Sequence, residues 1–381
     1  MRQSIEALGQ AAVAALNRGD AAGARKAFEE IVRLGHADTA VWLGIAIAAQ
    51  AQGDDPAAAA AADRVLADDS QNLRALLIRA ALHERAGDVR AAASFYAAAL
   101  GQIPEGVSLP GPIQREIDRA RTAEAQVRRR MEDHMRAQLE AGGYRDTAET
   151  RRFTQSLDLL SGRRQRYESR PRSYFFPELP SIAFHPRERF PWLAALEAQT
   201  DAIAGELAPL LETPGAFAPY VEAESNRPTD RDYRLLDNAE WTACYLWRDG
   251  VRNEPYASLC PRTMAAMEAI PLETIPRRAP FVLFSKLTPG AWIQPHHGFL
   301  NSRLVAHLPL IVPDGCWFRV GAETRSWRRG EAFVFDDTIE HEAKNPTRDT
   351  RVVLIFNVWR PELTEMERHL VSLLMQAVDD I

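Results

Sequence analysis

A glycine followed by an aspartate recurs in the first hundred residues at a fixed interval of 34 residues. The three copies are Gly19-Asp20, Gly53-Asp54 and Gly87-Asp88. Small or aromatic residues follow each glycine five and nine positions later: Ala24 and Phe28, Ala58 and Ala62, and Ala92 and Tyr96. Glycine suits a tight turn between helices, and a small residue lets two helices approach closely. A unit of this length cannot bury its apolar face alone, so neighbouring copies must stack.

The period and the placement of turn and small residues resemble tetratricopeptide repeats, in which each copy is a helix–turn–helix hairpin. Stacked hairpins present a concave surface that binds other chains. We therefore expect residues 1–108 to hold a polypeptide substrate or a protein partner and to carry no chemistry. A generic Ala-rich helical bundle is the alternative interpretation.

A charged segment, residues 109–169, follows the repeats and is predicted to be a helical connector. Within it, residues 112–141 predict one long helix that Pro112 opens and Gly142-Gly143 closes. Its run of arginines, Arg128-Arg129-Arg130, is interpreted as a solvated helix face, with phosphate or nucleic-acid binding as the minority interpretation. The net charge of −6 lacks the excess of positive charge that is typical of nucleic-acid-binding proteins, so we expect no nucleic-acid partner.

The apolar pattern changes to short strands in the predicted third domain, residues 170–381. Six runs of β-branched and aromatic residues are separated by turn clusters: 241–247, 281–287, 303–312, 316–320, 331–336 and 351–359. Such spacing favours an antiparallel sandwich or barrel, here a double-stranded β-helix of jelly-roll or cupin type. Helical periodicity after Pro191 and again from Glu362 to Ala377 predicts flanking helices. The chain is thus predicted to be multidomain, with α-helical repeats before a β domain.

The cellular location is predicted from features that the sequence lacks. The first residues contain no apolar signal-peptide core, and no run of about 18 apolar residues predicts a membrane anchor. The three cysteines, Cys244, Cys260 and Cys316, lie far apart without C-x-x-C spacing and predict buried free thiols in a reducing compartment. We therefore expect a cytoplasmic protein.

Four of the nine histidines fall between residues 285 and 359. His296 ends a short predicted strand, His341 follows 45 residues later, and Arg351 begins another strand ten residues after that. In a double-stranded β-helix this order brings the two imidazoles together at the open end and places the arginine deeper on the same side. Imidazole suits Fe(II), and an arginine fork holds a carboxylate well. The order resembles that of Fe(II)- and 2-oxoglutarate-dependent oxygenases. A metal-dependent isomerase or dioxygenase of cupin type would have no need for Arg351.

Three stretches, 295–308, 320–345 and 351–363, resemble the aspartyl/asparaginyl β-hydroxylase family. They contain PHHGFLNSRLVAHL, FDDTIEHE and the VW-x-PEL signature. The usual carboxylate ligand two residues after the first histidine is replaced by Gly298, as in the animal members of this family. The resemblance implies Fe(II) held by two histidines with water in the place of the carboxylate, 2-oxoglutarate as cosubstrate, and O2.

The resemblance also implies residue roles. His296 and His341 match the iron ligands, whereas Ser285 and Arg351 match the residues that grip the distal carboxylate of 2-oxoglutarate. His297 competes with His296 as a ligand, although in an extended segment its side chain should point the opposite way.

Two further residues match the family site. His307 matches a histidine beside the other end of the cosubstrate, and Trp241 matches a tryptophan on the wall. Ordinary alternatives stay open: Trp241 as a core residue, His307 as an outer hydrogen-bond partner and Ser285 as a plain strand serine. Asp337 is a rival third ligand, although an acidic pair with Asp336 more simply orients the turn.

The predicted function is hydroxylation of a C–H bond, at the β-carbon of an Asp or Asn residue in a polypeptide. Hydroxylation of a free amino acid or of a lipid-linked acyl chain is the alternative, as is an inactive repeat scaffold. Two departures from the family pattern bear on the substrate: Val305 stands where an arginine is frequent, and Cys260 has no nearby partner for a disulfide.

Overall fold

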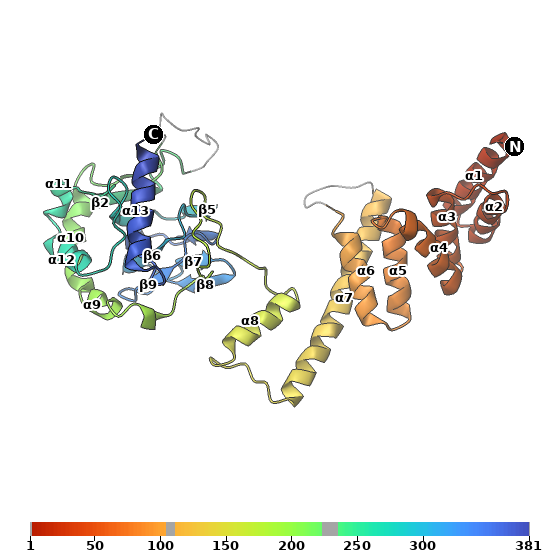
Figure 1. Cartoon of the computed structure of the whole chain (residues 1–381), viewed down its shortest axis with the longest axis horizontal. Coiled ribbons are helices and arrows are strands. Elements are labelled where there is room, and N and C mark those ends of the chain that lie inside the picture. The colour runs from red at the N-terminus through yellow and green to blue at the C-terminus, as the bar shows by residue number, and fades with distance from the viewer. Residues whose placement is uncertain (1, 104–110, 223–234, 381) are drawn as a thin grey trace. The chain divides into compact units, whose positions relative to one another are not determined.

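A computed structural model describes residues 2–103, 111–222 and 235–380. The chain separates into two compact units, Met1–Arg163 and Arg164–Ile381 (Figure 1). The boundary predicted at residue 108 lies outside the described residues. The division into three domains remains a prediction.

Three helical hairpins begin the N-terminal unit. Their helices are α1 (Arg2–Asn17) with α2 (Ala21–Arg33), α3 (Thr39–Ala51) with α4 (Asp55–Asp68), and α5 (Leu73–Arg85) with α6 (Val89–Leu100). Each hairpin packs against the next, and buried alanines make most of the shared core. The predicted repeat of hairpins is confirmed.

The same turn joins the two helices of each hairpin. Gly19, Gly53 and Gly87 have φ angles of 78°, 75° and 77°, a left-handed conformation that a side chain would strain. The aspartate that follows caps the next helix, as where Asp54 accepts a hydrogen bond from the backbone N–H of Ala57 at 3.1 Å. The small residues predicted to allow close packing are fully buried: Ala24, Ala58 and Ala92.

Two further helices complete this unit, α7 (Gly111–Ala141) and α8 (Arg151–Leu160). The first packs along α6 and adds Ala120 and Val127 to the core of the third hairpin (Figure 1). The long charged helix therefore covers the last repeat with its narrow apolar face. Its residues 128–130 are exposed, as a solvated arginine face requires.

Two antiparallel sheets form the centre of the C-terminal unit. The seven-stranded sheet has the order β1-β2-β4-β11-β6-β9, with β3 paired to β2, and the four-stranded sheet has the order β5-β10-β7-β8. The strands of the first are β1 (Ala218–Pro219), β2 (Trp241–Arg248), β3 (Val251–Arg252), β4 (Val282–Leu287), β6 (Arg303–Ile311), β9 (Phe333–Phe335) and β11 (Arg351–Trp359). Those of the second are β5 (Trp292–His296), β7 (Trp317–Val320), β8 (Glu323–Ser326) and β10 (His341–Lys344).

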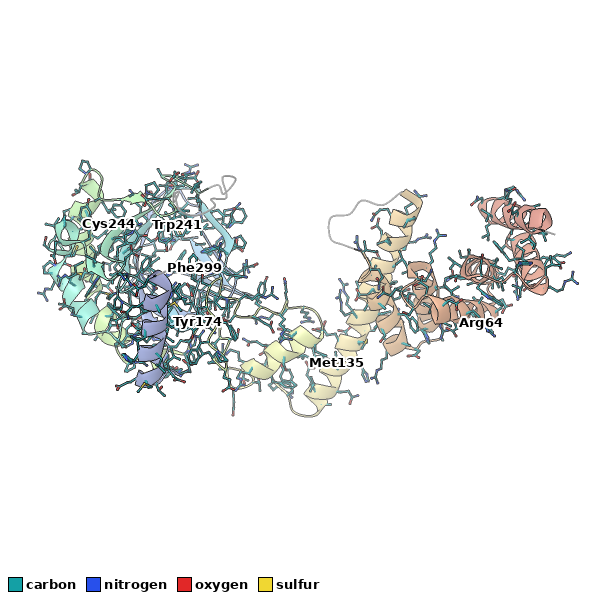
Figure 2. All side chains as sticks on the ribbon, turned by 45° about the horizontal axis from the view of Figure 1, so that its top comes forward. Arg64, Met135, Tyr174, Trp241, Cys244 and Phe299 are labelled. Atoms are coloured by element: carbon teal, nitrogen blue, oxygen red, sulfur yellow. The ribbon has the colours of Figure 1, made fainter. Side chains whose placement is uncertain are left out.

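Alternate residues of the large sheet sort into two layers, because successive strand side chains point to opposite faces. On β11, Leu354 and Phe356 pack against the helices, whereas Val353 packs against the small sheet. On β2, Cys244 belongs to the helix side and Trp241 to the side between the sheets; Figure 2 marks both. The predicted antiparallel β domain is confirmed, and its closer assignment as a double-stranded β-helix stays a prediction.

Helices flank this unit as expected, namely α9 (Leu193–Glu197), α10 (Thr200–Glu212), α11 (Glu254–Ala257), α12 (Pro261–Glu268) and α13 (Glu365–Asp379), with a 3-10 turn at Arg187–Arg189. The helical pattern after Pro191 is divided in two, and the Thr200 hydroxyl donates to the Glu197 carbonyl at 2.6 Å where α9 gives way to α10. In the described part of the chain, none of the helices combines the length and apolarity needed to span a membrane.

Candidate active site

His296 and His341 lie side by side on neighbouring strands of the small sheet. His296 is the last residue of β5, His341 is the first of β10, and the two are directly paired in the strand register. Their ring centroids are 4.1 Å apart. Both sit between the sheets, where His341 also meets the ring of Phe335 at 5.6 Å.

Each of these imidazoles is held by a backbone carbonyl two residues earlier in the chain. His296 Nδ1 lies 2.8 Å from the Gln294 oxygen, and His341 Nδ1 lies 3.1 Å from the Ile339 oxygen. A carbonyl only accepts, so each Nδ1 carries the proton and each Nε2 keeps its lone pair. Burial lowers the pKa of both histidines, which keeps the rings neutral. Neither Nε2 has a hydrogen-bond partner among the described residues, so the pair can offer two nitrogen donors to one metal ion.

Gly298 leaves a space that the side chain of Asp337 fills. A methyl carbon built on Gly298 would overlap the carboxylate of Asp337. The two residues are also joined by a hydrogen bond from the Gly298 N–H to the Asp337 carbonyl at 2.7 Å. Asp337 Oδ2 accepts from Arg303 at 3.3 Å, whereas its Oδ1 is buried without a partner in the described residues. Burial raises the pKa of Asp337 to about 6.

Asp336 has a different environment from its neighbour. It forms a fully buried ion pair with Arg360, and it accepts hydrogen bonds from the backbone N–H and the hydroxyl of Thr338. These bonds shape the turn that leads into β10. Within residues 2–103, 111–222 and 235–380, no three His, Cys, Asp or Glu side chains gather in a group that could hold a metal ion.

Ser285, Trp241 and Arg351 meet on the inner face of the large sheet. Ser285 Oγ accepts one hydrogen bond from Trp241 Nε1 at 3.1 Å and another from Arg351 Nη1 at 3.3 Å. The guanidinium also lies over the ring of Trp327, 4.5 Å from its centroid. Trp241 stacks on Tyr220 at 4.0 Å and lies 6.4 Å from the ring of His296, so it connects this group with the histidine pair.

Arg351 is a buried charge with no counter-charge in the part of the chain that the structure describes. It is 1% exposed, its Nε has no hydrogen-bond partner, and no carboxylate pairs with it among the described residues. Burial lowers its pKa to about 10, which still leaves it charged at neutral pH. A buried cation is costly unless an anion compensates it. The arrangement therefore fits an anionic group of a ligand.

His307 occupies the aromatic layer between the histidine pair and Arg351. Its ring lies 4.9 Å from Phe335 and 5.1 Å from Phe318, both of which also contact His341. Trp327 Nε1 donates to its Nδ1 at 3.3 Å, so the His307 proton resides on Nε2. Burial, with the charge of Arg351, holds the pKa of His307 well below its usual range.

The structure thus places the six residues singled out from the sequence around one inter-sheet region. His297 is set apart: its Nδ1 is buried without a partner in the described chain, and its ring takes no part in the contact between His296 and His341. Sequence reasoning missed Trp327, which contacts both Arg351 and His307. A single tryptophan in the arginine-rich stretch 325–329 gives no local signal of such a role.

Comparison with known proteins bears on the family that the sequence motifs resemble. Residues 197–361 match the family model described as Aspartyl/Asparaginyl beta-hydroxylase. The human protein named Aspartyl/asparaginyl beta-hydroxylase is 37% identical over 138 residues, which are 36% of this chain and 18% of that protein. The Ornithine lipid ester-linked acyl 2-hydroxylase of Rhizobium tropici is 34% identical over 175 residues, covering 45% of this chain and 58% of that protein. The resemblance inferred from the sequence motifs is confirmed.

The chain spans less than two thirds of the length of each of these relatives. Among solved structures, PcrH from Pseudomonas aeruginosa and the Arabidopsis OM64 TPR domain each align at 20% identity with a TM-score of 0.29. They cover 33% and 34% of this chain and 93% and 97% of their own. The repeat assignment therefore stands on the hairpins and turns themselves.

Proposed function

We propose that the C-terminal unit, which matches the aspartyl/asparaginyl β-hydroxylase family, is an Fe(II)- and 2-oxoglutarate-dependent hydroxylase. Its substrate is the β-carbon of an Asp or Asn residue in a polypeptide. One observation supports the proposal: two neutral imidazoles and a buried guanidinium, which has no carboxylate partner among the described residues, lie in the same inter-sheet region. The first suits a metal and the second a dicarboxylic cosubstrate.

His296 and His341 would hold Fe(II) through Nε2, because a backbone carbonyl holds Nδ1 of each ring. A set of only two protein ligands would leave room at the ion for the cosubstrate. Together with 2-oxoglutarate and O2, bound Fe(II) supplies the oxidising chemistry that hydroxylates a C–H bond and converts the cosubstrate to succinate and CO2.

Arg351 and Ser285 would bind the distal carboxylate of 2-oxoglutarate. Ser285 Oγ already accepts N–H bonds from Trp241 and Arg351, so its own proton is left to donate to a carboxylate oxygen. The ring of Trp327 lies against one face of the Arg351 guanidinium and helps to fix its orientation. His307, with its proton on Nε2, would donate a hydrogen bond nearer the metal end of the cosubstrate.

Asp337 would place its carboxylate in the space that a side chain at position 298 would occupy, but it would not bind the metal. Its position against Gly298 puts a carboxylate beside the end of β5, and its Oδ2 is already engaged with Arg303. It can accept a hydrogen bond from a water molecule in that direction. This assignment agrees with a two-histidine set and leaves Gly298 as the residue that separates this site from a three-ligand one.

The N-terminal repeats support a polypeptide substrate, because stacked hairpins present a surface suited to extended chains. A lipid-linked acyl chain is the second candidate, and the match to the Rhizobium tropici acyl hydroxylase favours it. Mass spectrometry separates the two. Proteins captured by an iron-site variant should gain 16 Da when treated with the active enzyme, whereas an acyl hydroxylase would leave them unchanged and oxidise lipid extracts.

The activity is tested by succinate formation from 2-oxoglutarate by the purified full chain with Fe(II) and ascorbate under air. We expect His296→Ala to lose both bound metal and succinate formation. His297→Ala is the matched control, since it removes the adjacent imidazole and should retain both. If His296→Ala keeps its metal content and wild-type protein forms no succinate, coupled or uncoupled, the proposal is wrong, and an inactive scaffold becomes the better interpretation.

A further inference from the structure

An arginine-rich segment lies at the start of the C-terminal unit. Residues 163–172 contain five arginines and one glutamate, although the whole chain has a net charge of −6. Two of the five have carboxylate partners, since Arg163 pairs with Glu132 and Arg166 pairs with Glu168. The candidate metal and cosubstrate residues include none of these arginines, so the positive charge of the segment has no role in the chemistry itself.

Backbone hydrogen bonds fix the second half of this segment beside the candidate metal site. The Arg170 N–H donates to the Thr338 carbonyl at 2.8 Å, and the Arg172 N–H donates to the Gly298 carbonyl at 2.9 Å. Gly298 lies two residues after one candidate iron ligand, and Thr338 lies three residues before the other. Both arginines therefore extend from backbone that is bonded directly to the segments carrying the histidine pair.

Arg170 and Arg172 are exposed, and neither guanidinium makes an ion pair or a hydrogen bond within residues 2–103, 111–222 and 235–380. Arg172 lies over the ring of Phe299, 5.3 Å from its centroid. The Phe299 carbonyl accepts from the Tyr174 N–H at 3.1 Å, and Figure 2 marks both of these residues. The contact with the ring leaves the N–H groups of Arg172 available to a planar anion. Arg170, Arg172 and Phe299 are called the Arg172 patch.

The chemistry of the Arg172 patch suits a carboxylate on a polypeptide. A guanidinium binds a carboxylate through two parallel hydrogen bonds, and the ring of Phe299, which is 46% exposed, offers apolar surface to the carbon atoms of the same side chain. An anionic bilayer is a poorer match. Recognition of a bilayer typically uses about four to eight basic residues, whereas this patch has two, on a chain whose net charge is negative.

We propose that the Arg172 patch binds an acidic residue of the polypeptide substrate, a few positions along the chain from the residue that is hydroxylated. This proposal rests on the proposed function and adds a sequence preference to its substrate class. An extended chain advances about 3.3 Å per residue. A substrate whose reacting residue lies at the histidine pair would therefore bring a side chain about two to four positions away past the patch.

The test measures the binding of fluorescein-labelled nine-residue peptides to the full chain loaded with Mn(II) and 2-oxoglutarate, read as fluorescence anisotropy. Each peptide has a central asparagine among alanines and serines. One set carries a glutamate at a single position on either side of the asparagine, and the matched set carries glutamine there, so that each pair differs by one charge. At the best position we expect the glutamate peptide to bind about five- to tenfold more tightly at low ionic strength, as for one or two exposed ion pairs. At about 0.5 M salt the difference should fall to about twofold or less.

The double variant Arg170→Gln/Arg172→Gln should reduce the preference for glutamate to about twofold or less at low ionic strength. Arg348→Gln is the matched control, because it removes an exposed positive charge that follows the end of β10 away from His341. It should leave the preference unchanged. Circular dichroism checks that each variant is folded, which is expected because all three side chains are exposed.

Equal binding of the two peptide sets, binding of neither set, or the same loss of preference in Arg348→Gln overturns the proposal. Binding to phosphatidylglycerol vesicles that requires Arg170 and Arg172, with no peptide bound, also overturns it and assigns the patch to a membrane surface. Succinate formation that depends on His296, measured with Fe(II) on the same protein, would leave the proposed hydroxylase function standing in each of these cases.

Discussion

Replacing Arg351 by methionine should abolish 2-oxoglutarate binding without destabilising the ligand-free protein. Methionine has a similar length and no charge, and the ring of Trp327 already lies against this position. The usual expectation for a fully buried arginine is a large loss of stability. Here the expectation is different because the guanidinium has no carboxylate partner among the described residues.

The magnitude follows from what Arg351 contacts. Without ligand it makes two long hydrogen bonds, both of 3.3 Å, to the backbone and side-chain oxygens of Ser285, and it stacks on Trp327. Those contacts contribute about 1–3 kcal/mol, and the burial of an unpaired charge costs several kcal/mol. We therefore expect the free energy of unfolding of Arg351→Met to fall by less than about 1 kcal/mol, or to rise.

The effect on binding should be much larger. A two-pronged bond between guanidinium and carboxylate contributes about 1.5–3 kcal/mol per hydrogen bond, so its loss should raise the Kd for 2-oxoglutarate at least about 100-fold. Arg351→Lys keeps the charge but not the fork, and it should fall between wild type and Arg351→Met. Arg348→Met, at an exposed position before β11, is the control for the loss of a nearby arginine.

Titration calorimetry with Mn(II) in place of Fe(II) gives the Kd without turnover. Thermal unfolding gives a second measure, since ligand at 100 times its Kd stabilises by about 2.7 kcal/mol, or roughly 5–10 °C for a unit of this size. The variant should show no such shift. If Arg351→Met binds 2-oxoglutarate within threefold of wild type, the carboxylate role of Arg351 is refuted. If the ligand-free variant loses more than about 3 kcal/mol, the description of this arginine as an uncompensated charge is refuted.

Three further predictions concern other parts of the chain. Gly298→Asp should not create a three-ligand site. It should destabilise the C-terminal unit by about 2 kcal/mol or more, because the new side chain overlaps Asp337. Denaturant unfolding followed by tryptophan fluorescence measures the loss, and Asp337→Ala in the double variant should restore stability. Burial raises the pKa of Glu273 from 4.5 to about 7, so this group's contribution to stability is complete below pH 4.5 and is lost as the pH rises through 7. Glu273→Gln should therefore gain up to roughly 3 kcal/mol relative to wild type between pH 4.5 and pH 8, and a difference that does not change with pH would contradict the assignment. Asp88→Ala should cost the repeats about 1 kcal/mol by removing a helix cap, measured by circular dichroism, while Asp54→Ala should cost more because Arg25 also donates to Asp54.

Local patterns were sufficient for the repeats and for most strands. The turn glycines and their capping aspartates act within four residues of each other, so their spacing predicts the hairpins without knowledge of the fold. The strands β2, β4, β6, β9 and β11 are rich in β-branched and aromatic residues and were predicted within a few residues. In contrast, β8 and β10 have the polar sequences ETRS and HEAK, which carry no apolar alternation to identify them.

At the candidate site, too, some features follow from local sequence and others only from packing. The spacing of His296, His341 and Arg351, with the motifs around them, was enough to single out candidate metal and cosubstrate residues. Spacing and motifs do not predict which charged groups surround each arginine, because those groups come from segments distant in the chain. Arg351 lies against Trp327, whereas Arg303 lies between Asp337 and Glu273, 34 residues after it and 30 before it. Both arginines begin a strand in the sequence. Packing alone leaves Arg351 without a carboxylate partner among the described residues and gives Arg303 two nearby carboxylates.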